Sequence, residues 1–197
     1  MKKRWRFILT ALLLLLPLTV MPAGADAGPK PSVVVELTGL EGRTCWGTLL
    51  TTQESTGPYR RFSGEEAAED PEEDRALNAL LPLALADSDG FHLLDFAADC
   101  SSGELSWTYY PPHTYKIALW FPEEDARAVS GVYHRYAFDS YYRLDLSGLE
   151  LAPGCTVELE EARLQRDYPY GASLLALAGR VVLTLGAELL LALAFGL

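Results

Sequence analysis

The sequence predicts a mainly β domain, an immunoglobulin-like or transthyretin-like sandwich of about seven strands with one inserted helix, followed by a transmembrane helix. Short runs of aromatic and β-branched residues recur after residue 91 and are separated by turn signals, which is typical of a sandwich or barrel. One acidic stretch leads into leucines at helical spacing. Residues 171–197 are almost continuously apolar and exceed the roughly 20 residues that a membrane-spanning helix needs.

The N-terminal end has the pattern of a secretory signal peptide. Four basic residues in the first six positions precede an apolar run over residues 7–16 and small residues up to Ala27. We therefore expect a signal peptide over residues 1–27 and a cell-membrane protein whose main domain, residues 28–156, is extracytoplasmic. Residues 157–170 would join this domain to a transmembrane helix over 171–197, either a single anchor or the first of several membrane helices.

Three consecutive valines open the domain. Apolar and polar residues alternate after the valines. This pattern predicts a strand over residues 32–38 with Val33, Val35 and Leu37 on one face. Residues 39–43 would turn the chain, so we expect residues 44–51 to form the partner strand of a hairpin.

The inserted helix is expected near residues 71–86. Pro71 suits a first helical turn, and the acidic residues 72–74 complement the positive end of a helix. Pro82 is expected to kink or end it. The acidic run is therefore interpreted as a solvated helix start rather than a cation site.

The remaining strands are expected in five runs: FHLLDFA, ELSWTYY, TYKIALWF, AVSGVYHRYAF and YYRLDL. Alternation predicts that Leu105, Trp107 and Tyr109 share one face of the strand ELSWTYY. It likewise places Ile117, Leu119 and Phe121 on one face of the strand TYKIALWF. A second short helix is expected over residues 157–168, between the sandwich and the membrane.

The chain is acidic, with 27 Asp and Glu against 16 Lys and Arg. Cleavage is expected near Ala25 or Ala27; after Ala25 it removes four basic residues and no acidic one, which takes the formal net charge from −11 to −15. Such a surface repels phosphate backbones, so nucleic acid is not an expected partner. Cationic ligands or divalent ions are compatible with it, and the lipid bilayer is the expected partner of the apolar end.

Three cysteines, Cys45, Cys100 and Cys155, cannot all pair with one another in one chain. Cys45 lies in one strand-like run and Cys100 ends another, so Cys45–Cys100 is the favoured single disulfide. In the alternative interpretation they are buried free cysteines, which behave as small apolar residues.

The sequence contains no motif with a specific chemistry, so no catalytic residue, metal site or cofactor is assigned. His92, His113 and His134 lack the spacing of zinc ligands, and neither a nucleophile elbow nor a Gly-rich phosphate loop occurs. Residues 87–90, DSDG, begin like a calcium loop but lack its closing glutamate, and a bare turn explains them.

An aromatic cluster around the Pro111–Pro112 turn is the candidate binding surface, formed by Trp107, Tyr109, Tyr110 and Tyr115. Only about half of the rings on alternating strands can point inward, so several are expected to be exposed. Exposed aromatic rings with acidic neighbours suit a carbohydrate, peptide or protein contact. The alternative is that these rings fill the core and rest on the membrane surface.

The transmembrane segment contains two charged residues, Arg180 and Glu188. They are eight residues apart, which is about 12 Å along one helix and nearly the same face. An ionised group at the bilayer centre costs on the order of 3 kcal/mol, so each is expected to face protein or water. We favour a partner helix, from another subunit or from further chain after Leu197; snorkelling is the alternative for Arg180.

Several segments resemble a family of uncharacterised bacterial membrane proteins: SVVVELTGLEG, CWGTLL, WTYYPPHTYKIALWFPE, YAFDSYY and RVVLTLGAELLLALAFG. The resemblance implies a signal peptide, a small extracytoplasmic domain and several membrane helices, with a membrane-embedded remainder after Leu197. It implies no catalytic residues, because the family has no assigned activity.

The leading hypothesis is a non-enzymatic, membrane-anchored extracytoplasmic binding module of the bacterial cell envelope, with a protein partner or further membrane helices. The alternative is the outer domain of a multi-helix transporter or membrane enzyme whose remaining helices follow Leu197. A secreted hydrolase is a third, weaker hypothesis.

Overall fold

The structure, a computed structural model, describes residues 30–64 and 70–195. Residues 30–168 form one compact unit, and the described residues from Pro169 onward belong to another. The signal peptide expected over residues 1–27 lies outside the described residues.

The first unit is mainly β, as the sequence predicts. Its strands within the described residues are β1 Ser32–Thr38, β2 Trp46–Thr51, β3 Ser55–Thr56, β4 Tyr59–Arg60, β5 Ala98–Asp99, β6 Glu104–Trp107, β7 Thr114–Phe121, β8 Ala126–Val129, β9 Tyr133–His134, β10 Asp139–Asp145, β11 Thr156–Glu158 and β12 Leu164–Arg166. Its helices are α2 Pro71–Ala86 and the 3₁₀ turn η1 Glu161–Arg163.

Two mixed sheets make up most of this unit. The first has the order β12-β10-β1-β6, with β1 parallel to β10 and antiparallel to β6. The second has the order β11-β8-β7-β2-β5, with β9 pairing the start of β7. β1 and β2 therefore lie in different sheets, and the predicted hairpin between residues 32–38 and 44–51 is wrong.

The two sheets share one hydrophobic core. Val33, Val35 and Leu37 of β1 are buried on its first side, and Ile117, Leu119 and Phe121 of β7 on the other, so the predicted apolar faces are confirmed. Gly47 of β2 also faces this core, where a Cβ would come within 2.9 Å of the Cys100 Sγ. A larger residue at this position would have to displace the side chains of Cys100 and of the leucines that pack on Gly47.

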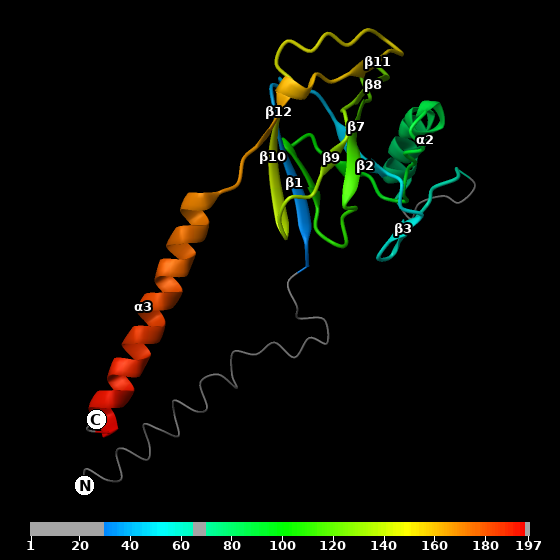
Figure 1. The fold of residues 1–197 in the computed structure, drawn as a ribbon. Coiled ribbons are helices and arrows are strands. Elements are labelled where there is room, and N and C mark those ends of the chain that lie inside the picture. Colours follow the sequence, from blue (N-terminus) through cyan, green and yellow to red (C-terminus); the bar gives the residue numbers. More distant parts are fainter. Residues whose placement is uncertain (1–29, 65–69, 196–197) are drawn as a thin grey trace. The chain divides into compact units, whose positions relative to one another are not determined.

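The opposite face of the second sheet is covered by α2. Figure 1 shows this helix on the side of β2 and β7 away from β1 and β10. Its Leu77 and Leu80 are fully buried in a second cluster with Leu50 of β2 and Trp120 of β7. The second sheet is therefore buried on both faces, which explains the near-continuous apolar run in β7.

The start of α2 is as predicted. Asp70 caps it, because its side chain accepts a hydrogen bond from the Glu72 N–H at 2.9 Å, and Pro71 occupies the first turn. Pro82 lies inside the helix, which continues to Ala86.

The helix expected over residues 157–168 is wrong. The segment holds β11, η1 and β12, which pair with β8 and β10 and so close one edge of each sheet. Leu159 and Leu164 are buried in the core between the sheets. Residues up to Tyr168 therefore belong to the β unit and form no separate juxtamembrane helix.

The second unit contains the helix α3, Tyr170–Phe195, whose 26 residues have a mean hydropathy of 1.9 in their most apolar part. None of its residues is buried. It is long and apolar enough to cross a membrane, as expected for residues 171–197, and by length and composition alone it weakly indicates membrane association.

Candidate functional site

A groove of about 640 Å³ lies between the C-terminal end of α2 and the strands β8 and β11. Leu83 of α2, Val129 of β8 and Leu159 after β11 give it apolar walls. Arg127 of β8 donates a hydrogen bond from Nε to the Ala79 carbonyl, which ties the helix to the sheet beside the groove. Its charged residues come from β7, from the loop that follows α2, from β11 and from η1.

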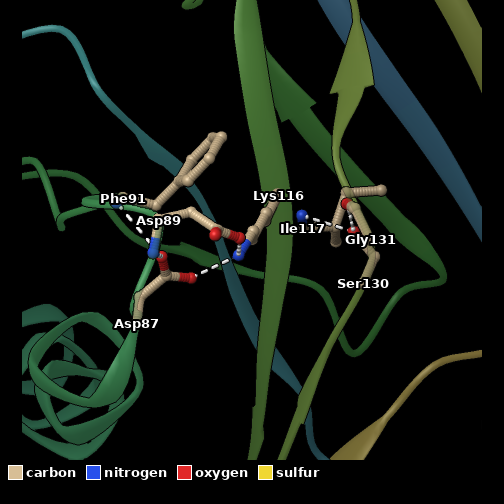
Figure 2. Close-up of polar contacts among 7 residues, drawn as sticks. All are labelled: Asp87, Asp89, Phe91, Lys116, Ile117, Ser130 and Gly131. Carbon is tan, nitrogen blue, oxygen red and sulfur yellow. Dashed lines mark hydrogen bonds and ion pairs between the residues drawn. The ribbon is translucent and has the colours of Figure 1, made fainter.

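Asp87 is positioned by the end of α2. The helix stops at Ala86, and the Asp87 Oδ1 accepts hydrogen bonds from the backbone N–H groups of Asp89 at 2.9 Å and Phe91 at 3.2 Å. This turn aims the other carboxylate oxygen, Oδ2, at the Lys116 Nζ, 2.5 Å away (Figure 2). The loop therefore holds a carboxylate against the sheet.

Lys116 stands on the face of β7 that α2 covers, in register with Ala118 and Trp120. Its side chain is only 12% exposed, and that of Asp87 only 7%. The Asp89 Oδ2 also contacts the Lys116 Nζ at 3.1 Å, and the ring centroid of Phe91 lies 4.7 Å from it. The ammonium group thus has two carboxylates and one aromatic face as partners.

Both partners of this ion pair stay charged. Burial by itself lowers the pKa of Lys116, but the hydrogen bonds to Asp87 and Asp89 outweigh it and the pKa is raised. Burial by itself raises the pKa of Asp87, but the hydrogen bonds from Lys116 and the backbone outweigh it and the pKa is lowered. A lysine held in its charged form does not serve as a general base.

Ser130 also lines the groove, and its hydroxyl is already engaged. It accepts a hydrogen bond from the Ile117 N–H at 2.8 Å and donates one to the Gly131 carbonyl at 2.8 Å (Figure 2). Among the described residues, no hydrogen bond joins Ser130 to Lys116. The two side chains do not form the nucleophile–base pair that acyl transfer needs.

The rim of the groove is acidic. Glu158 of β11 and Glu161 of η1 are exposed, and neither forms an ion pair within the described residues. The groove is therefore lined by four carboxylates, those of Asp87, Asp89, Glu158 and Glu161, and by one ammonium group. Because Asp87 already neutralises Lys116, the field at the mouth of the groove is negative.

The aromatic surface expected at residues 107–115 is half wrong. Trp107 and Tyr115 are fully buried, so they are core residues. Trp107 packs against Tyr59 and Phe96, with ring centroids 5.1 and 4.5 Å away, and its Nε1 donates to the Tyr109 carbonyl at 3.0 Å. For Tyr115, burial and the neighbouring Tyr142 raise the phenol pKa.

The remaining two rings of that expected surface are accessible. Tyr109 is half-buried and Tyr110 is 44% exposed, and their rings meet edge to face at 4.7 Å. The Lys30 Nζ lies 5.3 Å from the Tyr109 ring centroid and 5.7 Å from that of Tyr110. The accessible part of the predicted surface is therefore this pair.

Cys45 and Cys100 are brought together. The Cys100 N–H donates to the Cys45 carbonyl at 2.7 Å, which continues the antiparallel pairing of β2 and β5 by one position. Residues opposite each other on antiparallel strands have Cα atoms about 4.5–5.5 Å apart, a separation that a disulfide can bridge. Both are buried as free thiols here, with their pKa raised by burial, to about 12 for Cys100. The disulfide stays a prediction, which non-reducing peptide mapping tests.

Arg180 and Glu188 both lie on α3 and are exposed on it. Between them, the Thr184 hydroxyl donates to the Arg180 carbonyl at 2.9 Å. Within the described part of the chain, neither side chain has an ion-pair partner.

The three histidines do not converge on one point. The His92 Nε2 contacts the Gln53 carbonyl at 2.9 Å, while the His134 Nδ1 contacts the Thr114 hydroxyl at 3.0 Å. His113 and His134 are neighbours, with ring centroids 6.3 Å apart. Among the residues that the structure describes, no group of three His, Cys, Asp or Glu side chains could hold a metal ion.

Sequence reasoning missed the Lys116 cluster because it treated residues 87–90 as an isolated turn. A signal was present: Lys116 interrupts the apolar strand TYKIALWF, and a lysine there needs a buried counter-charge. Its partner lies 29 residues earlier, a separation that local patterns do not bridge.

Comparison of the chain with protein-family models, curated proteins and solved structures found no match.

Proposed function

We propose that this chain is a membrane-anchored, extracytoplasmic binding module of the bacterial cell envelope, and that its groove beside α2 binds a cationic segment of a protein partner. The signal-peptide pattern of residues 1–27 and the apolar helix α3 support the anchoring and the orientation. The resemblance to bacterial membrane proteins supports the cell-envelope location. The acidic composition of residues 30–168, with 25 Asp and Glu against 11 Lys and Arg, supports a basic partner.

The observation that carries the proposal is the charge arrangement of the groove. Its single lysine is neutralised at the floor by Asp87, while Glu158 and Glu161 remain uncompensated at the rim. A cationic side chain from a partner would contact these two carboxylates, and the apolar walls would contact its neighbours. A binding role also fits the engaged states of Lys116 and Ser130, which leave neither free for catalysis.

Binding of a lysine-rich peptide tests this assignment. For the full chain in detergent, we expect hexalysine to bind with an affinity that falls at least fivefold in the Glu158→Gln, Glu161→Gln double variant. The reason is the loss of two rim charges, each worth up to about 1 kcal/mol at an exposed site. Isothermal titration calorimetry at low and high salt measures the change, which should vanish at high salt.

The matched control is the Glu104→Gln, Glu150→Gln double variant. Both residues are exposed and lie outside the groove lining. Their double substitution removes two negative charges, as the groove variant does. We expect it to bind hexalysine nearly as well as the unchanged protein. Equal losses in the two double variants would mean that only the overall charge matters and would remove the groove from the proposal.

A second candidate function is favoured by Arg180 and Glu188. In this alternative the β unit is the outer domain of a multi-helix transporter or membrane enzyme, and the two charges belong to a polar network among membrane helices. An intramembrane ionisable residue supports such a function because its burial in lipid costs on the order of 3 kcal/mol.

Changing Glu188 to Gln separates the two candidates. If the second is right, the full-length protein should lose assembly with its partner helices, because the interhelical contact loses its charge. Crosslinking of the protein in native membranes measures this, and Leu189→Gln, on another face of α3, controls for added polarity. Unchanged assembly and unchanged cellular phenotype in Glu188→Gln would leave the binding module as the better candidate.

For the fold, we propose that the two-sheet arrangement is an immunoglobulin-like or transthyretin-like sandwich. The shared core between two sheets and the antiparallel pairs β1–β6, β2–β7 and β7–β8 support this assignment. The parallel pairs β1–β10 and β8–β11 are its departures from a purely antiparallel sandwich.

A further inference from the structure

A second pocket, of about 400 Å³, differs from the acidic groove in its charge. It lies where the segment after β2 and the β6–β7 loop meet the start of β1 and the end of β9, and it shares no lining residue with the groove. None of its nine described lining residues is acidic, whereas Arg135 and His113 are among them. In a unit with more than twice as many acidic as basic residues, a pocket free of carboxylates stands apart.

Arg135 is the main charge of this pocket. Its backbone N–H donates to the His113 carbonyl at 2.9 Å, which fixes its place at the end of β9. Arg135 is half-buried as a residue, and within the described part of the chain its guanidinium forms no ion pair and no hydrogen bond. By contrast, Arg143 contacts both Glu36 and Asp167, at 3.0 and 2.6 Å. A guanidinium without a counter-charge is suited to bind a planar or tetrahedral anion with paired N–H donors.

Two further polar groups line the same pocket. The Gln53 Oε1 accepts a hydrogen bond from the His113 N–H at 3.0 Å, so the amide NH₂ is left as the donor end of that side chain. The hydroxyl of Thr56, a residue only 7% exposed, has no hydrogen-bond partner among the described groups. That oxygen is also closed off from solvent, so the Gln53 amide is the polar donor that remains for a ligand beside Arg135.

One wall of the pocket is the ring of Tyr110. Its φ of 48° is in the left-handed region, which bulky residues rarely adopt, and the ring lies against the backbone of Gly57. A Cβ at Gly57 would come within 2.6 Å of that ring, so the contact requires glycine at this position. With Pro31 and Pro111, Tyr110 gives the pocket an uncharged wall beside Arg135.

We propose that this pocket binds a small anionic ligand, a carboxylate or phosphate carried on an uncharged ring or chain, with Arg135 holding the anionic group and Tyr110 contacting the uncharged part. The Gln53 amide supplies a further donor to the anion. This site is independent of the acidic groove, because the two pockets have no residue in common and opposite charge.

Saturation-transfer NMR on the full chain in nanodiscs tests the proposal with glucuronate as the probe and glucose as its neutral counterpart. We expect glucuronate to show saturation transfer and glucose to show none, because only the former has the carboxylate that Arg135 needs. Competition with inorganic phosphate and with acetate then identifies the preferred anionic group. Equal signals from glucose and glucuronate would overturn the proposal, as would no signal from glucuronate together with no binding of phosphate.

Two arginine variants complete the test. Arg135→Gln should weaken glucuronate binding at least tenfold, whereas Arg61→Gln, which removes an exposed arginine outside the pocket, should leave it unchanged. Circular dichroism checks that both arginine variants keep the fold. The comparison of glucose with glucuronate uses the unchanged protein, so it holds even if a variant fails to fold. Equal glucuronate affinities in Arg135→Gln and the unchanged protein would overturn the assignment.

Discussion

Replacing Asp87 with alanine is expected to lower the free energy of unfolding of the β unit by about 3 kcal/mol. The substitution leaves the Lys116 ammonium nearly buried without its closest carboxylate, and it also removes the acceptor for the N–H groups of Asp89 and Phe91. Guanidinium denaturation of the full chain in detergent, followed by near-ultraviolet circular dichroism, measures the loss.

Asp89→Ala is the matched control for that experiment. Its side chain is 63% exposed and contacts the same ammonium group at 3.1 Å, so the pair is screened by water and should contribute no more than about 1 kcal/mol. Comparable losses for the two alanine variants would show that burial of the Asp87–Lys116 pair does not set its contribution.

The same pair predicts a pH dependence. The pKa of Asp87 is lower in the folded protein than in the unfolded chain, so its contribution to stability is present above the ordinary carboxyl pKa and is lost as the pH falls through the lower folded value. The stability difference between the unchanged protein and Asp87→Asn should therefore shrink in acid. A difference that stays constant down to the acid-unfolding range would contradict this linkage.

Trp107→Ala is expected to cost about 4 kcal/mol of unfolding free energy. Trp107 is fully buried between Tyr59 and Phe96, and its removal leaves a large cavity in the core between the sheets. The denaturant midpoint measures the effect, and Tyr110→Ala, at an exposed ring, should change stability by less than about 1 kcal/mol. A small loss of unfolding free energy in Trp107→Ala would indicate that Trp107 belongs to the exposed aromatic surface predicted from the sequence.

Alternation along a strand was a sound guide to which residues share a face, as Val33, Val35 and Leu37 show. It did not tell which face is inward for the aromatic residues, because Trp107 and Tyr115 depend on where the other sheet lies. Nor did it identify strand partners, since β1 pairs with a strand that begins about a hundred residues later. Pairing at that distance leaves no trace in a local pattern.

The helix expected over residues 157–168 failed for a related reason. Its leucine and charge spacing suits a helix locally, but Leu159 and Leu164 are buried only if the segment follows the sheet edges. Backbone pairing with β8 and β10 then replaces the hydrogen bonds of a helix. Tertiary burial therefore outweighed local propensity, which is a weak prior for a segment this short.

The central position of β1 between β6 and β10 has a consequence for biogenesis. Because both neighbours are made later, the three adjacent valines of β1 have no strand partner until Trp107 has been synthesised, and β1 has both neighbours only once Asp145 has been synthesised. Pairing between strands this far apart in sequence slows folding, and the hydrophobic strand β1 stays exposed until the pairing is complete. The interval between synthesis of β1 and closure of this sheet is thus when the nascent chain is most prone to aggregate.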